Sequence, residues 1–158
     1  MRVLVFNQYC ELFSKFNSYL RNLYSGCVSS IYEPKLLGTA GTLIANIEKF
    51  RGHKTLLVHA DNWCQCDFSE FLGFHSNRRP LGTSITMMTF RTTSPTTCGI
   101  VEVDDRGVVQ NFHEKIEDPP GNLANGAVYL LEPEVSAWIG ERFFVKDFST
   151  EVIPCLLY

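Results

Sequence analysis

The stretch Thr55-Leu56-Leu57-Val58-His59-Ala60-Asp61 decides the fold, because it is a nearly continuous apolar run that stops at an acidic residue. Such a run is typical of a strand that is buried on both faces of a parallel sheet. Asp61 then stands at the carboxyl end of this strand. Because ligands of parallel α/β sheets bind outside these strand ends, Asp61 is a first candidate site residue.

Strand and helix patterns alternate on both sides of this stretch. Residues 3–6 and 28–32 are short β-type runs, and apolar residues recur at helical spacing between them, through about residue 24. A glycine-containing turn over residues 37–41 leads into a second helix, whose apolar residues continue to Phe50. This alternation predicts an α/β fold with a mostly parallel, Rossmann-like sheet, in which residues 3–6, 28–32 and 55–60 are parallel strands.

A third helix is expected after the 55–60 strand. Asp67 and Glu70 have the positions of an N-cap and of the acidic residue of a capping box, so the helix should run from about residue 68 to His75. It completes the order β-α-β-α-β-α.

The pattern changes after residue 84. The turn Asp104-Asp105-Arg106-Gly107 joins residues 99–103 to residues 108–112 and predicts a β-hairpin. Further strands are expected at 85–90 and 127–131, Pro133 opens a helix to about Ile139, and Ser149 caps a final helix. We expect residues 1–158 to form a single domain, since no linker interrupts them.

Composition excludes several classes of function. The chain has 158 residues, a net charge of −3 and a pI near 5.8, so it has no broad basic face for nucleic acid. No apolar run is long enough for a membrane span, and the first residues do not form a signal peptide. Neither nucleic acid nor membrane is an expected partner, and we expect a cytoplasmic location.

The six cysteines are scattered without the spacing of a disulfide framework, which favours reduced thiols. Cys64 and Cys66 are separated by one residue, which is too short for the usual zinc pair. The neighbouring His59 and His75 do not complete a known ligand spacing. The sequence therefore gives little support to a metal site here.

Five segments together resemble the sugar-1-phosphate nucleotidyltransferase family, which includes mannose-, heptose- and glucose-1-phosphate enzymes. In family order they are Glu33-Pro34 with Leu37-Gly38-Thr39-Ala40-Gly41-Thr42-Leu43, Asp61, Gly99-Ile100-Val101, Glu114-Lys115 and Asn125-Gly126. The resemblance covers residues 3–155. It implies a nucleotide-diphospho-sugar transferase-like fold and the transfer of a nucleotidyl group from a nucleoside triphosphate to a sugar 1-phosphate, with Mg²⁺ required. The guanylyltransferase branch, of mannose or heptose type, is the one that the segments resemble most.

The resemblance assigns the nucleotide to the loop of Leu37, Gly38, Thr39, Ala40 and Gly41. Glycines there allow a close approach of the backbone to a flat base. It assigns Mg²⁺ to Asp61, although Ala60 replaces the glycine that the family usually has before this residue. Judged alone, the loop is equally an ordinary glycine turn before a helix, and Asp61 equally a solvated residue at a strand end.

The sugar pocket implied by the resemblance consists of Gly99, Glu114, Lys115, Asn125 and Gly126. Glu114 would accept hydrogen bonds from sugar hydroxyls, and Lys115 would neutralise the sugar phosphate as a catalytic residue with Asp61. The alternative for these positions is a solvated charge pair at a strand end and ordinary hairpin and turn geometry.

The family begins with a strand and a Gly-rich, Arg-containing loop that holds the triphosphate, and neither is present in the 158 residues. Two functions are therefore open: an enzyme impaired as an isolated chain, or a non-catalytic module that binds sugar phosphate or nucleotide. Without that central strand, one edge of the sheet has no partner strand and is open to pairing with another strand. We expect a homodimer, and direct pairing of residues 3–6 with residues 55–60 in a monomer is the alternative.

Overall fold

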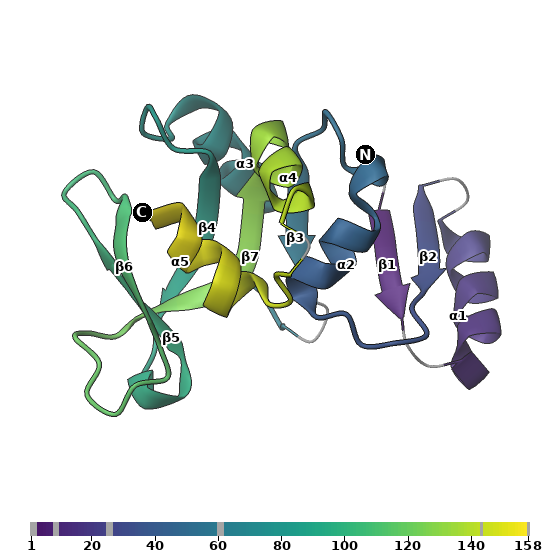
Figure 1. Ribbon diagram of the computed structural model, residues 1–158, viewed down its shortest axis with the longest axis horizontal. Helices are drawn as coiled ribbons and strands as arrows, with labels where there is room; N and C mark the ends of the chain where they lie inside the picture. The colour runs from purple at the N-terminus through teal and green to yellow at the C-terminus, as the bar shows by residue number, and fades with distance from the viewer. Residues whose placement is uncertain (1–2, 8–9, 25–26, 60–61, 143, 158) are drawn as a thin grey trace. The chain divides into compact units, whose positions relative to one another are not determined.

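The computed structural model describes residues 3–7, 10–24, 27–59, 62–142 and 144–157 (Figure 1). The chain divides into two compact units, Met1–Gly38 and Thr39–Tyr158. Each unit has its own sheet, and the single domain over residues 1–158 stays a prediction. In the part of the chain that is described, no helix has the length and apolar character of a membrane span.

The first unit is a β-α-β motif. Strand β1 (Val3–Asn7) pairs in parallel with β2 (Val28–Tyr32), in a register from Val3↔Val28 to Asn7↔Tyr32. Helix α1 (Cys10–Leu23) makes the crossover that two parallel strands require. Both strands and the helix lie where the sequence predicts them, and the parallel pairing of residues 3–6 with residues 28–32 is confirmed.

The second unit has a five-stranded sheet built around β7 (Leu123–Leu131). Strands β3 (Thr55–Val58) and β4 (Ile85–Arg91) pair antiparallel with β7, and β5 (Gly99–Val103) joins it at Ile100↔Ala124. The hairpin partner of β5 is β6 (Val109–Glu114). The predicted hairpin is confirmed, and Figure 1 shows β7 between β3 and β4.

The prediction that residues 55–60 form a third parallel strand beside residues 3–6 and 28–32 is wrong. Among the described residues, β1 pairs with β2 alone, and β3 belongs to the other sheet, where it runs antiparallel to β7. The apolar run is also not buried on both faces, since Leu56 and Val58 are 36% and 40% exposed. An apolar run favours a strand of either direction, so the partner strand decided its direction. In the described part of these ranges, β1 and β3 are likewise not paired with each other.

Helices cover the second sheet and connect its strands. They are α2 (Thr39–Ala45), the 3₁₀ turns Ile47–Lys49 and Pro95–Thr97, α3 (Phe68–Asn77), α4 (Pro133–Gly140), a π-helical turn (Phe148–Val152) and α5 (Ile153–Leu157). Asp67 caps α3 as predicted, accepting hydrogen bonds from the backbone N–H groups of Ser69 and Glu70. The final helical segment is capped by Asp147, not by Ser149, because Asp147 accepts a hydrogen bond from the Thr150 N–H.

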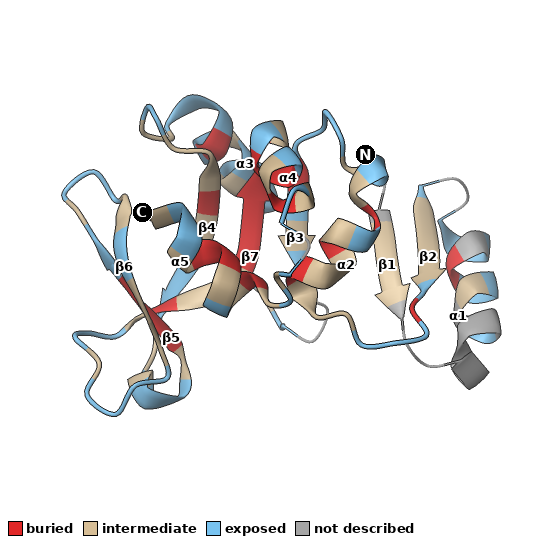
Figure 2. Cartoon of the chain, in the orientation of Figure 1, coloured by how far each residue is buried: buried red, intermediate tan, exposed pale blue. Residues whose placement is uncertain are grey.

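The core of the second unit lies between β7 and the helices α2, α4 and α5. Its buried members come from all of these elements: Ala40, Leu43, Tyr129, Leu131, Val135, Ile139, Phe148, Val152 and Ile153. The rings of Tyr129 and Phe148 lie 4.7 Å apart at its centre. Figure 2 shows β7 as a largely buried strand. The same strand therefore supplies both the backbone pairing and part of the core.

A buried polar cluster follows β7. The Glu132 carboxylate lies 2.7 Å from Arg79, 3.0 Å from Lys54 and 3.2 Å from His75. The hydrogen bond and charge of Lys54 lower the pKa of Glu132, and burial lowers the pKa of His75. Because the carboxylate is paired from three sides, this cluster fixes the junction of β7 with α4.

We expect Phe148→Ala to lower the free energy of unfolding by about 3–5 kcal/mol, because Phe148 is fully buried and the smaller side chain leaves a cavity. Phe144 is the matched control, since it is 93% exposed, and Phe144→Ala should change stability by less than about 0.5 kcal/mol. Urea denaturation of both variants measures the difference. Equal losses would contradict the described core.

Candidate functional site

Three of the predicted sugar-side residues lie together across strands β6, β5 and β7. Gly99 and Glu114 are direct partners in the hairpin, and Asn125 follows Ala124, the partner of Ile100. Backbone pairing thus brings together residues that are 26 positions apart in sequence, Gly99 and Asn125.

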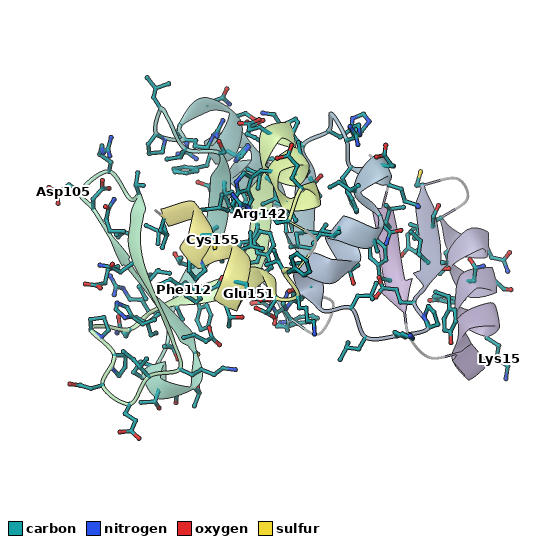
Figure 3. All side chains as sticks on the ribbon, in the orientation of Figure 1. Lys15, Asp105, Phe112, Arg142, Glu151 and Cys155 are labelled. Carbon is teal, nitrogen blue, oxygen red and sulfur yellow. The ribbon has the colours of Figure 1, made fainter. Side chains whose placement is uncertain are left out.

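Position 99 requires a glycine, because the side chains of Phe112 and Glu114 lie over it. A Cβ atom at this position would come within 2.6 Å of the Phe112 ring and 2.7 Å of Glu114 Oε2. Phe112, labelled in Figure 3, comes from β6 and packs against the core. The missing side chain lets the Glu114 carboxylate fold over the hairpin, where it is one-third exposed and can accept hydrogen bonds.

The chain leaves β6 at Lys115, where the backbone changes direction. Its φ angle is 49°, in the left-handed region, and its backbone N–H donates to the Cys98 carbonyl. The Lys115 ammonium lies 3.5 Å from Glu114 Oε1, with the side chain 63% exposed. A solvated pair of this kind adds little stability, so the ammonium remains available to a phosphate. The structure thus brings Lys115 together with Glu114 and Gly99.

Asn125 and Gly126 lie at an irregularity in β7. Met87 faces Tyr129 and Thr89 faces Asn125, so Met88 alone stands opposite the intervening residues of β7. The irregularity requires a left-handed Ala127, with φ 51°, and a glycine at position 126, where a Cβ atom would come within 3.0 Å of the Met88 carbonyl oxygen. The Asn125 side chain stabilises it by accepting a hydrogen bond from the Ala127 N–H. Asn125 therefore has a structural role besides any role in binding.

Tyr129 joins the predicted residues as one that the sequence analysis missed. Its hydroxyl accepts a 2.6 Å hydrogen bond from the Asn125 amide and lies 3.1 Å from Ser149 Oγ. Burial raises the pKa of Tyr129, and the charges of Asp147 and Glu114 act in the same direction. The phenol is therefore a neutral hydrogen-bonding group. Its spacing of four residues from Asn125, on the same face of one strand, was the available signal.

The predicted nucleotide loop crosses the division between the two units. Leu37 and Gly38 end the first unit, and Gly38 has a φ angle of 78°. Thr39, Ala40 and Gly41 begin α2. They belong to the second unit, which also contains the sugar-side residues. The prediction that a glycine-containing turn leads into a helix here is thus confirmed.

The second half of that loop is fastened to residues 146–148. The backbone N–H groups of Ala40 and Gly41 donate to the Lys146 carbonyl, and the Phe148 N–H donates to Thr39 Oγ1. Glu151, labelled in Figure 3, accepts from the N–H groups of Lys146 and Asp147, and these bonds lower the pKa of its carboxyl. The Ala40 and Gly41 amides are therefore bonded within the protein, and the carbonyls of these two residues belong to the hydrogen bonds of α2.

Asp61, the predicted Mg²⁺ ligand, lies outside the described residues, as does Ala60. Its neighbours are attached to the irregular part of β7: the Asn62 side chain donates to the Gly126 carbonyl at 3.0 Å, and the His59 N–H donates to the Ala127 carbonyl at 3.5 Å. Among the residues that the structure describes, no three His, Cys, Asp or Glu side chains are arranged to hold a metal ion. Asn62 is a second residue that the sequence analysis missed.

Comparison with known proteins shows the class of this protein. The family model described as "Nucleotidyl transferase" matches residues 2–157, so the chain belongs to the nucleotidyl transferase family. Two solved structures share the fold. A putative glucose-1-phosphate thymidylyltransferase from Bacillus anthracis has a TM-score of 0.74 and 16% identity over 88% of this chain and 55% of its own. HddC from Yersinia pseudotuberculosis has a TM-score of 0.72 and 18% identity over 97% of this chain and 64% of its own.

Among the curated relatives of this chain are mannose-1-phosphate guanylyltransferases. A mannose-1-phosphate guanylyltransferase of Mycobacterium tuberculosis is 29% identical over 82% of this chain and 35% of its own. A mannose-1-phosphate guanylyltransferase catalytic subunit beta of Drosophila pseudoobscura pseudoobscura is 30% identical over 79% of this chain and 33% of its own. A probable mannose-1-phosphate guanylyltransferase of Oryza sativa is 28% identical over 94% of this chain and 40% of its own. The chain spans about a third of the length of these relatives. The expected family and the Rossmann-like fold class are confirmed, with parallel pairing restricted to β1 and β2 among the described strands.

We expect Gly99→Ala to lower the free energy of unfolding by about 1–3 kcal/mol, because its methyl group would overlap the Phe112 ring and the Glu114 carboxylate. Gly121→Ala is the control, since a Cβ atom there meets nothing within 4 Å. Urea denaturation should show a loss for Gly99→Ala only. An unchanged Gly99→Ala variant would mean that Phe112 and Glu114 do not lie over this glycine.

Proposed function

We propose that this chain carries the sugar-phosphate side of a sugar-1-phosphate nucleotidyltransferase site, of the guanylyltransferase type. The observation that carries the proposal is the placement of Glu114 over Gly99, beside the β7 irregularity that holds Asn125. The names of the mannose-1-phosphate guanylyltransferase relatives support mannose 1-phosphate as the first substrate to test, with a heptose 1-phosphate as the second choice.

In this proposal, the sugar lies against Gly99 and Gly126. Glu114 accepts hydrogen bonds from its hydroxyls, the Asn125 amide both donates to them and accepts from them, and the Lys115 ammonium neutralises its phosphate. Asn125 is held by Tyr129 and Ala127, so it is oriented before the sugar arrives and little side-chain entropy is lost on binding. Leu37, Gly38, Thr39, Ala40 and Gly41 receive the nucleotide.

Mg²⁺ is the metal ion that we propose for the site, with Asp61 as its ligand. When bound, it would neutralise charge on the phosphates of the nucleotide. Carboxylate oxygens suit this hard cation, and the described residues His59 and Asn62 are hydrogen-bonded to the Ala127 and Gly126 carbonyls of β7. We also propose a cytoplasmic location, because Cys27, Cys64, Cys66, Cys98 and Cys155 are unpaired thiols.

For the isolated 158-residue chain we predict binding with at most trace turnover. In-line transfer requires cationic groups around the triphosphate, each worth about 10²–10³ in rate, and the family's Gly-rich, Arg-containing loop is not among these residues. Calorimetry should detect Mg²⁺-dependent binding of mannose 1-phosphate and a guanine nucleotide. A pyrophosphate-release assay should stay far below about 1 s⁻¹, a rate within the ordinary enzyme range.

Matched variants test the assignment of residues. Lys115→Ala and Asp61→Ala should weaken binding on the order of tenfold or more, since a hydrogen bond to a charged group contributes about 1.5–3 kcal/mol. Lys49→Ala and Asp105→Ala remove the same charges at other exposed positions and should leave binding unchanged. Equal effects of all four variants would reject the proposed pocket. Turnover near 1 s⁻¹ would reject the prediction of impairment and leave the pocket in place.

We further propose that the chain forms a homodimer, because β1 is paired along one edge only among the described residues and an open edge is a template for another strand. Light scattering over a hundredfold range of concentration should give the mass of two chains at the upper end. A proline at Val5, in the middle of β1, should reduce association if this edge makes the contact. A mass of one chain at every concentration would reject the dimer.

A further inference from the structure

Three sulfur atoms meet at the loop before α3. The Cys64 Sγ lies 3.3 Å from the Sδ atom of Met88, a residue of β4 that is 24 positions further along the chain. Cys66 is two residues from Cys64 and lines the same shallow groove as Met88. All three side chains are partly buried. Two thiols and a thioether therefore converge at one place, and none of them belongs to the proposed sugar or nucleotide site.

The backbone holds each of these residues in place. Cys66 directly precedes Asp67, the N-cap of α3, so the helix start fixes its position. Met88 lies where the register of β4 against β7 shifts, with Gly126 packed against its carbonyl. Cys66 and Met88 line a shallow groove together with Phe71 and Phe74 of α3. The sulfur atoms are thus positioned by two separate elements and have an apolar wall beside them.

We propose that Cys64, Cys66 and Met88 form a binding site for a soft monovalent cation of the Cu(I) type. Thiolates and thioethers are soft ligands, and this combination selects Cu(I) among biological metal ions. Zinc usually takes four nitrogen or sulfur ligands in a tetrahedron, whereas the described residues bring three sulfur atoms together here. The thioether is decisive, because it cannot ionise and serves a soft cation better than a hard one.

Binding requires no change of oxidation state. The two thiols each release a proton to solvent, and the two thiolates and the Met88 thioether then hold the cation. A disulfide between Cys64 and Cys66 is the competing chemistry. A thioether takes no part in a disulfide, so the contact of the Met88 Sδ atom with Cys64 favours metal coordination over a disulfide.

The test is anaerobic titration of the chain with Cu(I), reduced by ascorbate, in competition with the chromophoric chelator bicinchoninate. We expect one Cu(I) per chain to be retained against the chelator. The Cys64→Ser/Cys66→Ser double variant should lose it. Met88→Leu keeps the apolar volume but not the sulfur, and should weaken binding by at least about tenfold, the loss typical even for residues behind metal ligands.

Cys155→Ser is the matched control, because Cys155 is an exposed thiol of α5, labelled in Figure 3, and its loss should leave Cu(I) binding unchanged. Circular dichroism of each variant confirms that it is folded. The proposal is overturned if the wild-type chain yields all its Cu(I) to the chelator, or if the double variant retains as much as wild type. It is also overturned if alkylation and mass measurement show Cys64 and Cys66 joined as a disulfide under these conditions.

Discussion

The backbone pairing of β7 is the interaction on which the larger unit depends. β7 pairs with β4 along one edge and with β3 and β5 along the other, so each of these strands takes its place from the same nine residues. Its side chains Tyr129 and Leu131 also belong to the core beneath α2 and α4. Displacing β7 by one residue would turn these side chains to the opposite face of the sheet and would break the register of three neighbours together.

The irregularity within β7 links this scaffold to the candidate site. Asn125 stays paired with Thr89 of β4, but the left-handed Ala127 turns the backbone just after it, and the Asn125 side-chain amide bonds to Tyr129 and Ala127. Such irregularities commonly re-aim a side chain next to a functional site. The local strain is compensated by the well-packed halves of β7 on either side, which fix the chain direction before and after it.

Many polar groups of the candidate site are already hydrogen-bonded within the protein. The amides of Ala40 and Gly41 are bonded to the Lys146 carbonyl, and the Tyr129 hydroxyl joins Asn125 to Ser149. Glu114 and Lys115 are, by contrast, exposed to solvent and close to each other. The site therefore combines rigid groups, whose hydrogen bonds are made within the protein, with two charged groups at its rim. This division suits the proposed recognition of a phosphorylated sugar, because rigid groups define shape, the Glu114 carboxylate can accept from hydroxyls and the Lys115 ammonium can receive the phosphate.

The sequence by itself determined the features that depend on neighbouring residues. The Asp104–Gly107 turn specified the β5–β6 hairpin, Asp67 specified the start of α3, and the order of five short segments identified the family. Only the tertiary structure decided which strands pair and in which direction, because the apolar run at 55–58 fits a parallel or an antiparallel partner equally well. It also decided that Gly99 lies beneath Glu114, that Tyr129 holds Asn125, and that Met88 reaches Cys64. These contacts join residues distant in sequence or on opposite strands, and no local pattern of residue types encodes the register that brings them together.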